Sequence, residues 1–287
     1  SGRIVKTFKG HTHTVQDCAF SPDGTQIISA SSDNTLKLWD VKSGRIVKTF
    51  KGHTHTVQDC AFSPDGTQII SASRDRTLKL WDTNTAVCKK TFRGHSREIW
   101  GCDFSPDGNR IVSASRDGTL KTWDVTITNG TTPFMGHSKI VHECKISPDN
   151  TKILSASSDK SLKLWDITSM KELLSFKGHT HHVEGCSFSP DGHIILSCSD
   201  DETLKLWDVQ TGKILKEFCG HSKTVNACAF SPDGTKIISA SSDKTLKLWD
   251  IKKCKELNTF KGHSDVIYDC CFSPDGEKVL SASWDNT

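Results

Sequence analysis

The sequence lacks most of the features that mark membrane, secreted or nucleic-acid-binding proteins. No apolar run of the 287-residue chain approaches the roughly eighteen residues that span a bilayer. Its opening SGRIVKTFKGH contains neither an apolar signal core nor a cleavage site of small residues. Lys plus Arg outnumber Asp plus Glu by only 37 to 34, and the basic residues form no blocks. We therefore expect a cytoplasmic protein that binds no membrane and no nucleic acid.

The chain also lacks a CxxC pair with zinc-site spacing, although it contains 12 cysteines. Seven of the cysteines recur at one position of a repeat, namely Cys18, Cys60, Cys102, Cys144, Cys186, Cys228 and Cys270. A small residue needed at the same core position in each repeat explains this pattern better than disulfide bonds or metal ligation. We expect no cofactor.

Two dipeptides recur with a fixed period of 42 residues. Gly-His occurs at residues 10–11, 52–53, 94–95, 136–137, 178–179, 220–221 and 262–263. Trp-Asp follows 28 residues after the His in the first six repeats, at residues 39–40, 81–82, 123–124, 165–166, 207–208 and 249–250. Residues 1–40 and 43–82 differ at only two positions, Ser32 against Arg74 and Asn34 against Arg76. The chain is therefore built from tandem repeats.

Each full repeat contains four short segments rich in β-branched or large apolar residues, such as VQDCAF, TQIISAS, TLKLWD and RIVKTF. Turn-forming sequences such as Ser-Pro-Asp-Gly separate them. The pattern predicts one four-stranded sheet for each repeat. A single sheet of this kind cannot bury both of its faces, whereas sheets packed around a ring cover one another.

The Gly-His to Trp-Asp unit resembles the repeat of the WD40 family, and the resemblance covers the whole chain. It implies an all-β fold, a seven-bladed β-propeller of four-stranded antiparallel blades, with residues 1–287 as a single domain. The last repeat ends before its TLKLWD-like segment, so we expect an incomplete last blade without its third strand. In the family an N-terminal strand completes this blade, and residues 3–8 are the expected strand here. We prefer a chain cut from a longer protein over a last blade that closes with three strands.

The resemblance also implies a hydrogen-bonded tetrad in each complete repeat. The six sets are His11, Ser29, Asp33 and Trp39; His53, Ser71, Asp75 and Trp81; His95, Ser113, Asp117 and Trp123; His137, Ser155, Asp159 and Trp165; His179, Ser197, Asp201 and Trp207; and His221, Ser239, Asp243 and Trp249. The seventh repeat keeps His263, Ser281 and Asp285 but not the tryptophan. So many copies of one buried Ser-His-Asp set indicate a structural network and not a catalytic triad. We expect no enzyme.

In WD40 proteins the face that carries the Gly-His loops, called the top face, commonly binds peptides. Frequent contact points are the third and fifth residues after the His and the residue just before the tetrad Asp. These positions and their neighbours give the predicted partner-binding residues Arg74, Arg76, Glu98, Trp100, Arg116, Ile140, His142, His182, Glu184, Asp200, Tyr268 and Trp284. The two tryptophans outside the tetrads and the single tyrosine all fall in this set, as interface anchors do.

Charge is uneven around this face. Arg74, Arg76 and Arg116 with Trp100 form a basic, aromatic sector, and Glu184, Asp200 and Glu202 form an acidic one. We hypothesise that an acidic or phosphorylated partner segment binds the basic sector, because Arg pairs with such groups through two parallel hydrogen bonds. A solvated face with balanced charges is the alternative.

One clustered set of potential metal ligands stands out in the repeat alignment, His142, His181 and His182 with Glu184. Histidines in loops are more often solvated than bound to a metal, so the sequence favours no metal site.

These patterns favour a non-enzymatic scaffold or ligand-sensing domain that binds a protein or peptide ligand, or other domains of a larger parent protein. Repeats of the form VxxCxFSPDGxxIxSASxDxTLKLWD are most similar to the C-terminal propellers of NACHT or NB-ARC proteins, such as apoptotic protease-activating factor. A substrate adaptor of ubiquitin ligases, a G-protein β-like scaffold, and a designed or consensus-like repeat protein without a natural partner are open alternatives.

Overall fold

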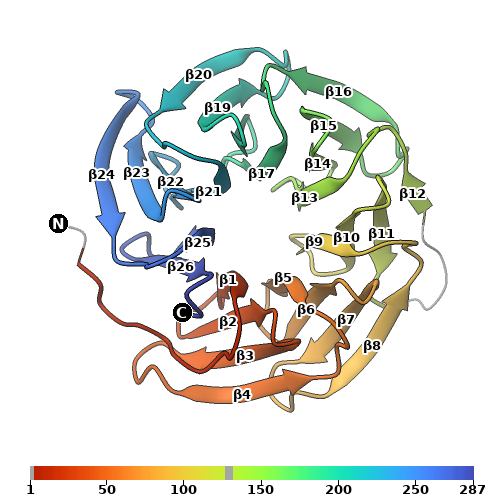
Figure 1. Ribbon diagram of the computed structural model, residues 1–287. Coiled ribbons are helices and arrows are strands. Elements are labelled where there is room, and N and C mark those ends of the chain that lie inside the picture. The colour runs from red at the N-terminus through yellow and green to blue at the C-terminus, as the bar shows by residue number, and fades with distance from the viewer. Residues whose placement is uncertain (1–2, 127–131) are drawn as a thin grey trace.

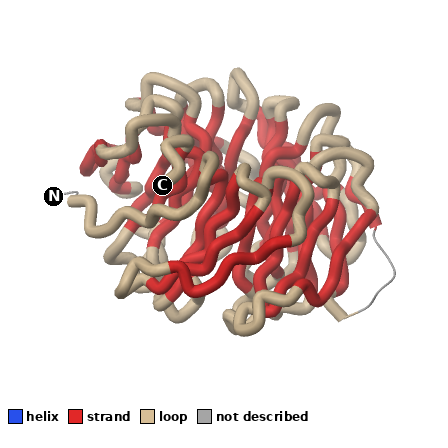
Figure 2. The backbone as a smooth tube through the Cα atoms, turned by 60° about the horizontal axis from the view of Figure 1, so that its bottom comes forward, coloured by secondary structure: helices blue, strands red, loops and turns tan. Residues whose placement is uncertain are grey.

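Seven β-sheets stand around a ring, one for each repeat (Figure 1). The computed structural model describes residues 3–126 and 132–287. In the four-stranded sheets the first strand lies nearest the centre of the ring and the fourth lies at the rim (Figure 1). Figure 2 shows the strands running between two sets of loops. The two faces of the ring are therefore built from loops.

Six of the sheets have four antiparallel strands, paired in chain order. The first three consist of β1 (Val15–Phe20), β2 (Gln26–Ser31), β3 (Thr35–Asp40) and β4 (Ile46–Lys51); β5 (Val57–Phe62), β6 (Gln68–Ser73), β7 (Thr77–Asp82) and β8 (Cys88–Arg93); and β9 (Ile99–Phe104), β10 (Arg110–Ser115), β11 (Leu120–Asp124) and β12 (Thr132–Phe134).

The next three consist of β13 (Val141–Ile146), β14 (Lys152–Ser157), β15 (Ser161–Asp166) and β16 (Glu172–Lys177); β17 (Val183–Phe188), β18 (Ile194–Ser199), β19 (Thr203–Asp208) and β20 (Ile214–Cys219); and β21 (Val225–Phe230), β22 (Lys236–Ser241), β23 (Thr245–Asp250) and β24 (Lys255–Lys261). The seventh sheet has β25 (Ile267–Phe272) and β26 (Val279–Ser283). Within the described part of the chain, no helix has the length and apolar character needed to cross a membrane.

Burial along a blade follows the position of the strand in the sheet. β2 is buried at five of its six residues, whereas β4 is buried only at Phe50. Neighbouring sheets cover the second strand on both faces, and the hydrophobic cores lie between sheets. Ile28 and Leu36 of the first blade, for example, pack with Val57 and Trp81 of the second. This packing explains why the tryptophan of Trp-Asp recurs, because it fills the space between two blades.

Carboxylates on the innermost strands join one sheet to the next. Asp17 Oδ2 accepts a hydrogen bond from the backbone N–H of Cys60 at 2.8 Å, which links the first blade to the second. The backbone N–H of Cys18 donates to Asp269 Oδ2 at 3.2 Å, which links the seventh sheet to the first. The ring therefore closes through side chains even though its seventh sheet is small.

The seventh blade differs from the prediction. We expected a seven-bladed propeller in which residues 3–8 supply the outer strand of the last blade, and this expectation was wrong. The structure has six complete blades and a partial seventh sheet of two strands, and residues 3–14 form no strand. In a complete blade the fourth strand pairs with the third, as β4 does with β3. Without a third strand, the backbone of residues 3–8 has no ladder of hydrogen bonds to join.

The N-terminal segment instead packs against the first blade through its side chains. The Phe8 ring meets Trp39 edge to face, with centroids 5.7 Å apart, just as Phe50 meets Trp81 at 5.7 Å. Lys6 Nζ donates a hydrogen bond to the carbonyl oxygen of Val41 at 3.3 Å. The segment is drawn as a loop in Figure 2. Side-chain packing therefore holds it where backbone pairing is missing.

Candidate partner-binding face

Each Gly-His loop is fastened to its own sheet by the same hydrogen bonds. With a neutral imidazole, His95 Nδ1–H donates to Asp117 Oδ2 at 2.8 Å and Ser113 Oγ–H donates to His95 Nε2 at 2.8 Å. Trp123 Nε1–H donates to Ser113 Oγ at 2.9 Å. The other five complete repeats form the same three contacts. The seventh repeat forms only the contacts of its histidine.

The tetrad aspartates are held in the ionised state. Burial by itself raises the pKa of Asp117, but hydrogen bonds from His95 and Thr119 outweigh it and hold the pKa well below its usual range. The Asp117 carboxylate also accepts a hydrogen bond from the backbone N–H of Ser96 at 3.0 Å. One side chain thus fixes both the Gly-His loop and the turn between the second and third strands.

The tetrad cannot act as a catalytic triad in this setting. Ser113 has no exposed surface, and its hydroxyl lies between the His95 ring and the Trp123 indole. A substrate therefore cannot reach the nucleophile that a triad requires. The network instead fixes the Gly-His loops and the turns between the second and third strands on one face of the ring, which we call the top face. The predicted partner-binding residues lie on these loops or at the adjoining ends of the innermost strands.

Four arginines surround an open depression on the top face between the second and third blades. The depression has a volume of about 360 Å³ and is lined by Arg74, Arg76, Ser96, Arg97, Glu98 and Arg116; we call it the arginine pocket. Arg116 Nη1 pairs with Glu98 Oε1 at 3.1 Å, and Arg74 Nε donates to Gln58 Oε1 at 3.0 Å. The structure thus gathers the predicted basic residues around one hollow.

A row of contacting side chains runs from Arg74 on the second blade across the next three blades. The guanidinium of Arg74 lies over the Trp100 indole, 5.2 Å from the ring centroid. Trp100 meets the His142 ring edge to face at 5.6 Å, and His142 stacks on His182 at 6.4 Å. We call these four residues the aromatic arc. Its members come from four different repeats, so only the closed ring places them in contact.

Tyr268 and Trp284 form a separate aromatic pair on the seventh sheet, with ring centroids 6.2 Å apart. Trp284 is 53% exposed. Burial raises the pKa of Tyr268, and the positive charge of Arg74 partly opposes this rise. The predicted anchors therefore lie in two groups, one on the third blade and one on the seventh. Ile140 is half-buried, and its carbonyl oxygen accepts a hydrogen bond from Ser157.

The predicted acidic sector carries less negative charge than its sequence suggests. Burial, and then the neighbouring charge of Asp200, raises the pKa of Glu184 to about 8. Burial, and then repulsion by His182, lowers the pKa of His142 to about 4. Asp200 Oδ2 lies 3.3 Å from His182 Nδ1. The raised pKa therefore reduces the negative charge that Glu184 contributes to this sector near neutral pH.

Sequence reasoning did not find two lining residues of the arginine pocket, Ser96 and Arg97. Arg97 follows the tetrad residue His95 by two positions, whereas the family contact points follow by three and five. The signal that could have found it is the arginine itself, because the equivalent residues of the first two repeats are His13 and His55.

A ring of repeated sheets, with one tetrad per complete blade and the candidate binding residues on one face, defines a β-propeller of tandem blades. The family model described as WD domain, G-beta repeat matches residues 2–40, 44–82, 86–124, 129–166, 170–208, 212–250 and 254–287. The chain therefore belongs to the WD40-repeat family. Propellers of this family typically mediate protein–protein interactions and are generally non-enzymatic scaffolds.

Individual repeats are similar to those of several characterised proteins. The small ribosomal subunit protein RACK1 of Saccharomyces cerevisiae is 58% identical over 40 residues, which cover 14% of this chain and 12% of that protein. The WD40 repeat-containing protein smu1 of Dictyostelium discoideum is 50% identical over 38 residues, 13% of this chain and 7% of that protein. Human pre-mRNA-processing factor 17 is 46% identical over 41 residues, 14% of this chain and 7% of that protein. Each match spans about one repeat.

Proposed function

We propose that this propeller is a non-enzymatic scaffold that binds an acidic or phosphorylated peptide segment in the arginine pocket of its top face. The observation that carries the proposal is the composition of the pocket, which has four arginines and only one glutamate around a hollow of about 360 Å³. Guanidinium groups bind carboxylates and phosphates through two parallel hydrogen bonds, which suits an anionic side chain.

The arginines of the pocket divide into two kinds. Arg74 is oriented by Gln58 and by the Trp100 ring, and Arg116 is partly neutralised by Glu98. Arg76 and Arg97 are exposed, and neither has an ion-pair partner among residues 3–126 and 132–287. A pre-oriented guanidinium loses little conformational entropy on binding, and an unpaired one gives up no existing ion pair. We therefore expect Arg74, Arg76 and Arg97 to provide most of the affinity.

Trp100 supplies an apolar anchor beside these charges. Its indole N–H is buried and finds no acceptor among the described residues. A ligand oxygen that reaches this N–H would remove the cost of an unsatisfied buried donor. Tryptophan and arginine are the residue types that most often dominate the binding energy of an interface.

A second depression fits the proposal less well. It has a volume of about 410 Å³, lies between the fourth and fifth blades, and is lined by Lys160, Lys163 and Lys177 among other residues. Lys163 is already paired with Glu172 at 2.6 Å. Lysine also lacks the planar, two-pronged geometry of arginine. We therefore assign the anionic ligand to the arginine pocket.

The cellular setting belongs to the same proposal. We propose a cytoplasmic sensor or scaffold similar to the C-terminal propellers of NACHT or NB-ARC proteins. The sequence pattern of the repeats supports the similarity. The seven repeat cysteines, which are buried thiols, support the cytoplasmic location. The relatives named above do not single out this subfamily.

The proposal is tested by fluorescence anisotropy with three labelled peptides of one sequence, carrying alanine, aspartate or phosphoserine at the same positions. We expect the aspartate or phosphoserine peptide to bind more tightly than the alanine peptide. The double variant Arg74→Glu, Arg116→Glu should abolish this preference, since it replaces two positive charges of the pocket with negative ones.

The matched control is the double variant Lys42→Glu, Lys252→Glu, which makes the same change of net charge. Both lysines are exposed and lie in the hairpins that follow Trp-Asp, at the end of the sheets opposite the tetrad turns. This variant should retain the preference. Equal loss in both double variants would mean that net charge alone governs binding, and equal binding of all three peptides would reject an anionic ligand.

A further inference from the structure

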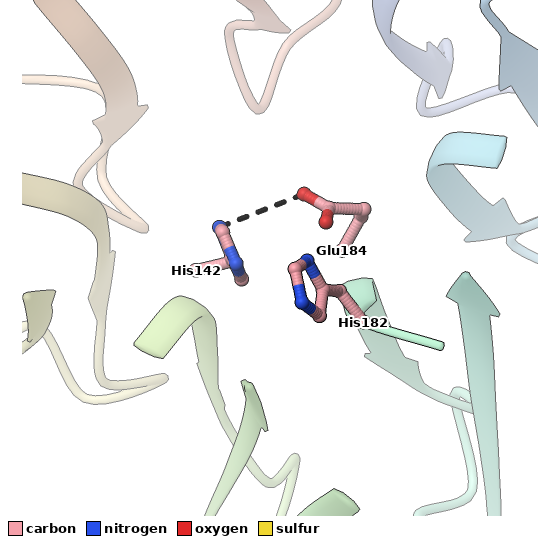
Figure 3. Close-up of side chains that lie close together, drawn as sticks. All are labelled: His142, His182 and Glu184. Atoms are coloured by element: carbon pink, nitrogen blue, oxygen red, sulfur yellow. Dashed lines mark ion pairs between the residues drawn. The ribbon is translucent and has the colours of Figure 1, made fainter. Parts of the chain in front are cut away.

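Three side chains with metal-binding atoms meet where the fourth and fifth blades adjoin on the top face. His142 lies on β13, Glu184 lies on β17, and His182 immediately precedes β17 (Figure 3). One ring nitrogen of each histidine and one carboxylate oxygen all lie within 4.8 Å of one another. This contact between blades brings His142 next to two residues that lie 40 and 42 positions further along the chain.

The cluster breaks the symmetry of the repeats. His142 and Glu184 occupy the fifth position after the tetrad histidine, where the other repeats have Gln16, Gln58, Trp100, Asn226 and Tyr268. His182 occupies the third position, where most other repeats have an apolar residue or threonine. A residue required by the fold would recur at these positions. The three side chains are therefore specific to this part of the ring.

One ring nitrogen of each histidine lies near an oxygen outside the cluster. His142 Nε2 lies 2.6 Å from Ser158 Oγ, and His182 Nδ1 lies 3.3 Å from Asp200 Oδ2. The contact of Nε2 with Ser158 leaves His142 Nδ1 as the coordinating atom of this residue. Histidines that bind metals generally donate their other ring N–H to a carboxylate or another oxygen, which fixes the tautomer and the ring orientation.

The nitrogen of His142 that faces the cluster is poorly satisfied by the protein. His142 Nδ1 is buried and makes no hydrogen bond with any of the described residues. It points toward Glu184 Oε2 at 3.5 Å, too far for a good hydrogen bond (Figure 3). Two ligands of a tetrahedral zinc ion lie about 3.4 Å apart, given Zn–N distances of about 2.0–2.1 Å. This pair of atoms thus already has the spacing that an ion between them needs.

We propose that His142, His182 and Glu184 bind a divalent transition-metal ion, with Zn²⁺ as the best match. Two imidazoles and one carboxylate are a common zinc ligand set that leaves a fourth position for water or a partner group. The side chains of His142 and Glu184 are 12% and 22% exposed, and that of His182 is 45% exposed. His142 and Glu184 therefore form the buried side of the site, and His182 lies on the side that is open to solvent. This site is independent of the peptide proposed for the arginine pocket.

Zn²⁺ binding to the purified full chain is measured by isothermal titration calorimetry. Co²⁺ binding is measured by titration with detection of the visible absorption of the ion. We expect one high-affinity ion per chain. His142→Ala and Glu184→Gln should each weaken Zn²⁺ binding by about tenfold or more, and Ser158→Ala should weaken it through the orientation of His142. Glu184→Gln preserves the shape of the side chain. This variant tests whether the cluster binds Zn²⁺ even if His142→Ala fails to fold.

The matched control is His181→Ala, which removes an exposed histidine next to the cluster. Its affinity for Zn²⁺ should equal that of the wild type. The proposal is overturned if the wild type binds no Zn²⁺ in the micromolar range. It is equally overturned if Glu184→Gln binds as tightly as the wild type, or if His181→Ala causes the same loss as His142→Ala.

Discussion

The guanidinium of Arg74 lies over the indole of Trp100, 5.2 Å from the ring centroid. The contact joins the second blade to the third, and the first two repeats provide a natural test of it. In the first repeat Ser32 takes the place of Arg74 and accepts a hydrogen bond from Gln16 at 2.9 Å. Arg74→Ser can therefore form the same bond with Gln58 while it loses the contact with the ring.

Arg74→Ser should lower the free energy of unfolding by about 0.5–1 kcal/mol, the range of an exposed cation–π contact. Urea unfolding measures the change. The control is Arg76→Asn, which also copies the first repeat. Arg76 has φ of 67°, a left-handed conformation that asparagine tolerates better, so this variant should be neutral or slightly more stable. Equal destabilisation of both variants would show that the contact between Arg74 and the Trp100 ring does not stabilise the fold.

Asp117→Ala should lower the free energy of unfolding by about 1–3 kcal/mol, because buried donors lose their acceptor. His95, Ser96 and Thr119 all donate to this carboxylate. Asp285→Ala in the seventh repeat should cost less, since its partner His263 is 17% exposed and water can replace the lost bond. Thermal unfolding of both variants checks the order, and an unchanged melting temperature for Asp117→Ala would argue against the network.

Acid should destabilise the propeller below about pH 4, the unfolded pKa of aspartate. The tetrad aspartates have lowered pKa values in the folded state because hydrogen bonds outweigh burial. Their contribution is therefore present above the unfolded pKa and is lost as pH falls toward the folded pKa. Asp103 acts in the opposite direction at higher pH, since burial raises its pKa to about 6 against the pull of Lys145.

Urea unfolding measured between pH 2 and pH 4 tests whether stability falls as the pH decreases. Asp117→Asn removes one of these titrating groups and keeps the shape of the side chain. Its free energy of unfolding should therefore fall less steeply with decreasing pH than that of the wild type. An identical slope in the two proteins would show that Asp117 does not take part in acid unfolding.

Adding Leu-Lys-Leu-Trp-Asp after Thr287 should stabilise the seventh sheet. The turn that leads to a third strand is already formed, because the backbone N–H of Ser283 donates to the Thr287 carbonyl at 3.1 Å, as Ser115 does to Thr119 at 3.2 Å. The added tryptophan can donate to Ser281. We expect the melting temperature to rise by a few degrees, since about 1 kcal/mol corresponds to roughly 2–4 °C in a large domain.

The control for this extension carries Leu-Lys-Leu-Ala-Asp, which provides the strand without the indole. It should recover only part of the gain. If both extensions leave the melting temperature unchanged, the exposed edge of β26 does not limit the stability of the ring.

The elements that sequence reasoning located well depend on local chemistry. Segments such as VQDCAF and TLKLWD are strands in the structure, and the Asp-containing turns between strands lie where the repeat places them. The prediction of an outer strand at residues 3–8 was wrong for a non-local reason. The apolar pattern of these residues is suitable for a strand, but a strand also needs a neighbour, and no third strand of the seventh blade is present to pair with it.

The candidate sites show the same division. The alignment placed Trp100, His142 and Glu184 at contact positions. It also grouped His142, His181 and His182 with Glu184 as potential metal ligands, but it favoured no metal site. It could not show that Arg97 joins the arginine pocket, or that His142, His182 and Glu184 approach within 4.8 Å. These distances depend on how adjacent blades are rotated about the ring, which no single repeat encodes.

By itself, the sequence determined the repeat, its strands and the residues of each tetrad, because these depend on periodicity and on contacts within one blade. The tertiary structure decided how the seventh sheet ends and which side chains meet across blades, as Arg74 and Trp100 do. The physical reason is that hydrophobic packing between blades sets the geometry of the ring, and residues distant in sequence become neighbours only once the ring has closed.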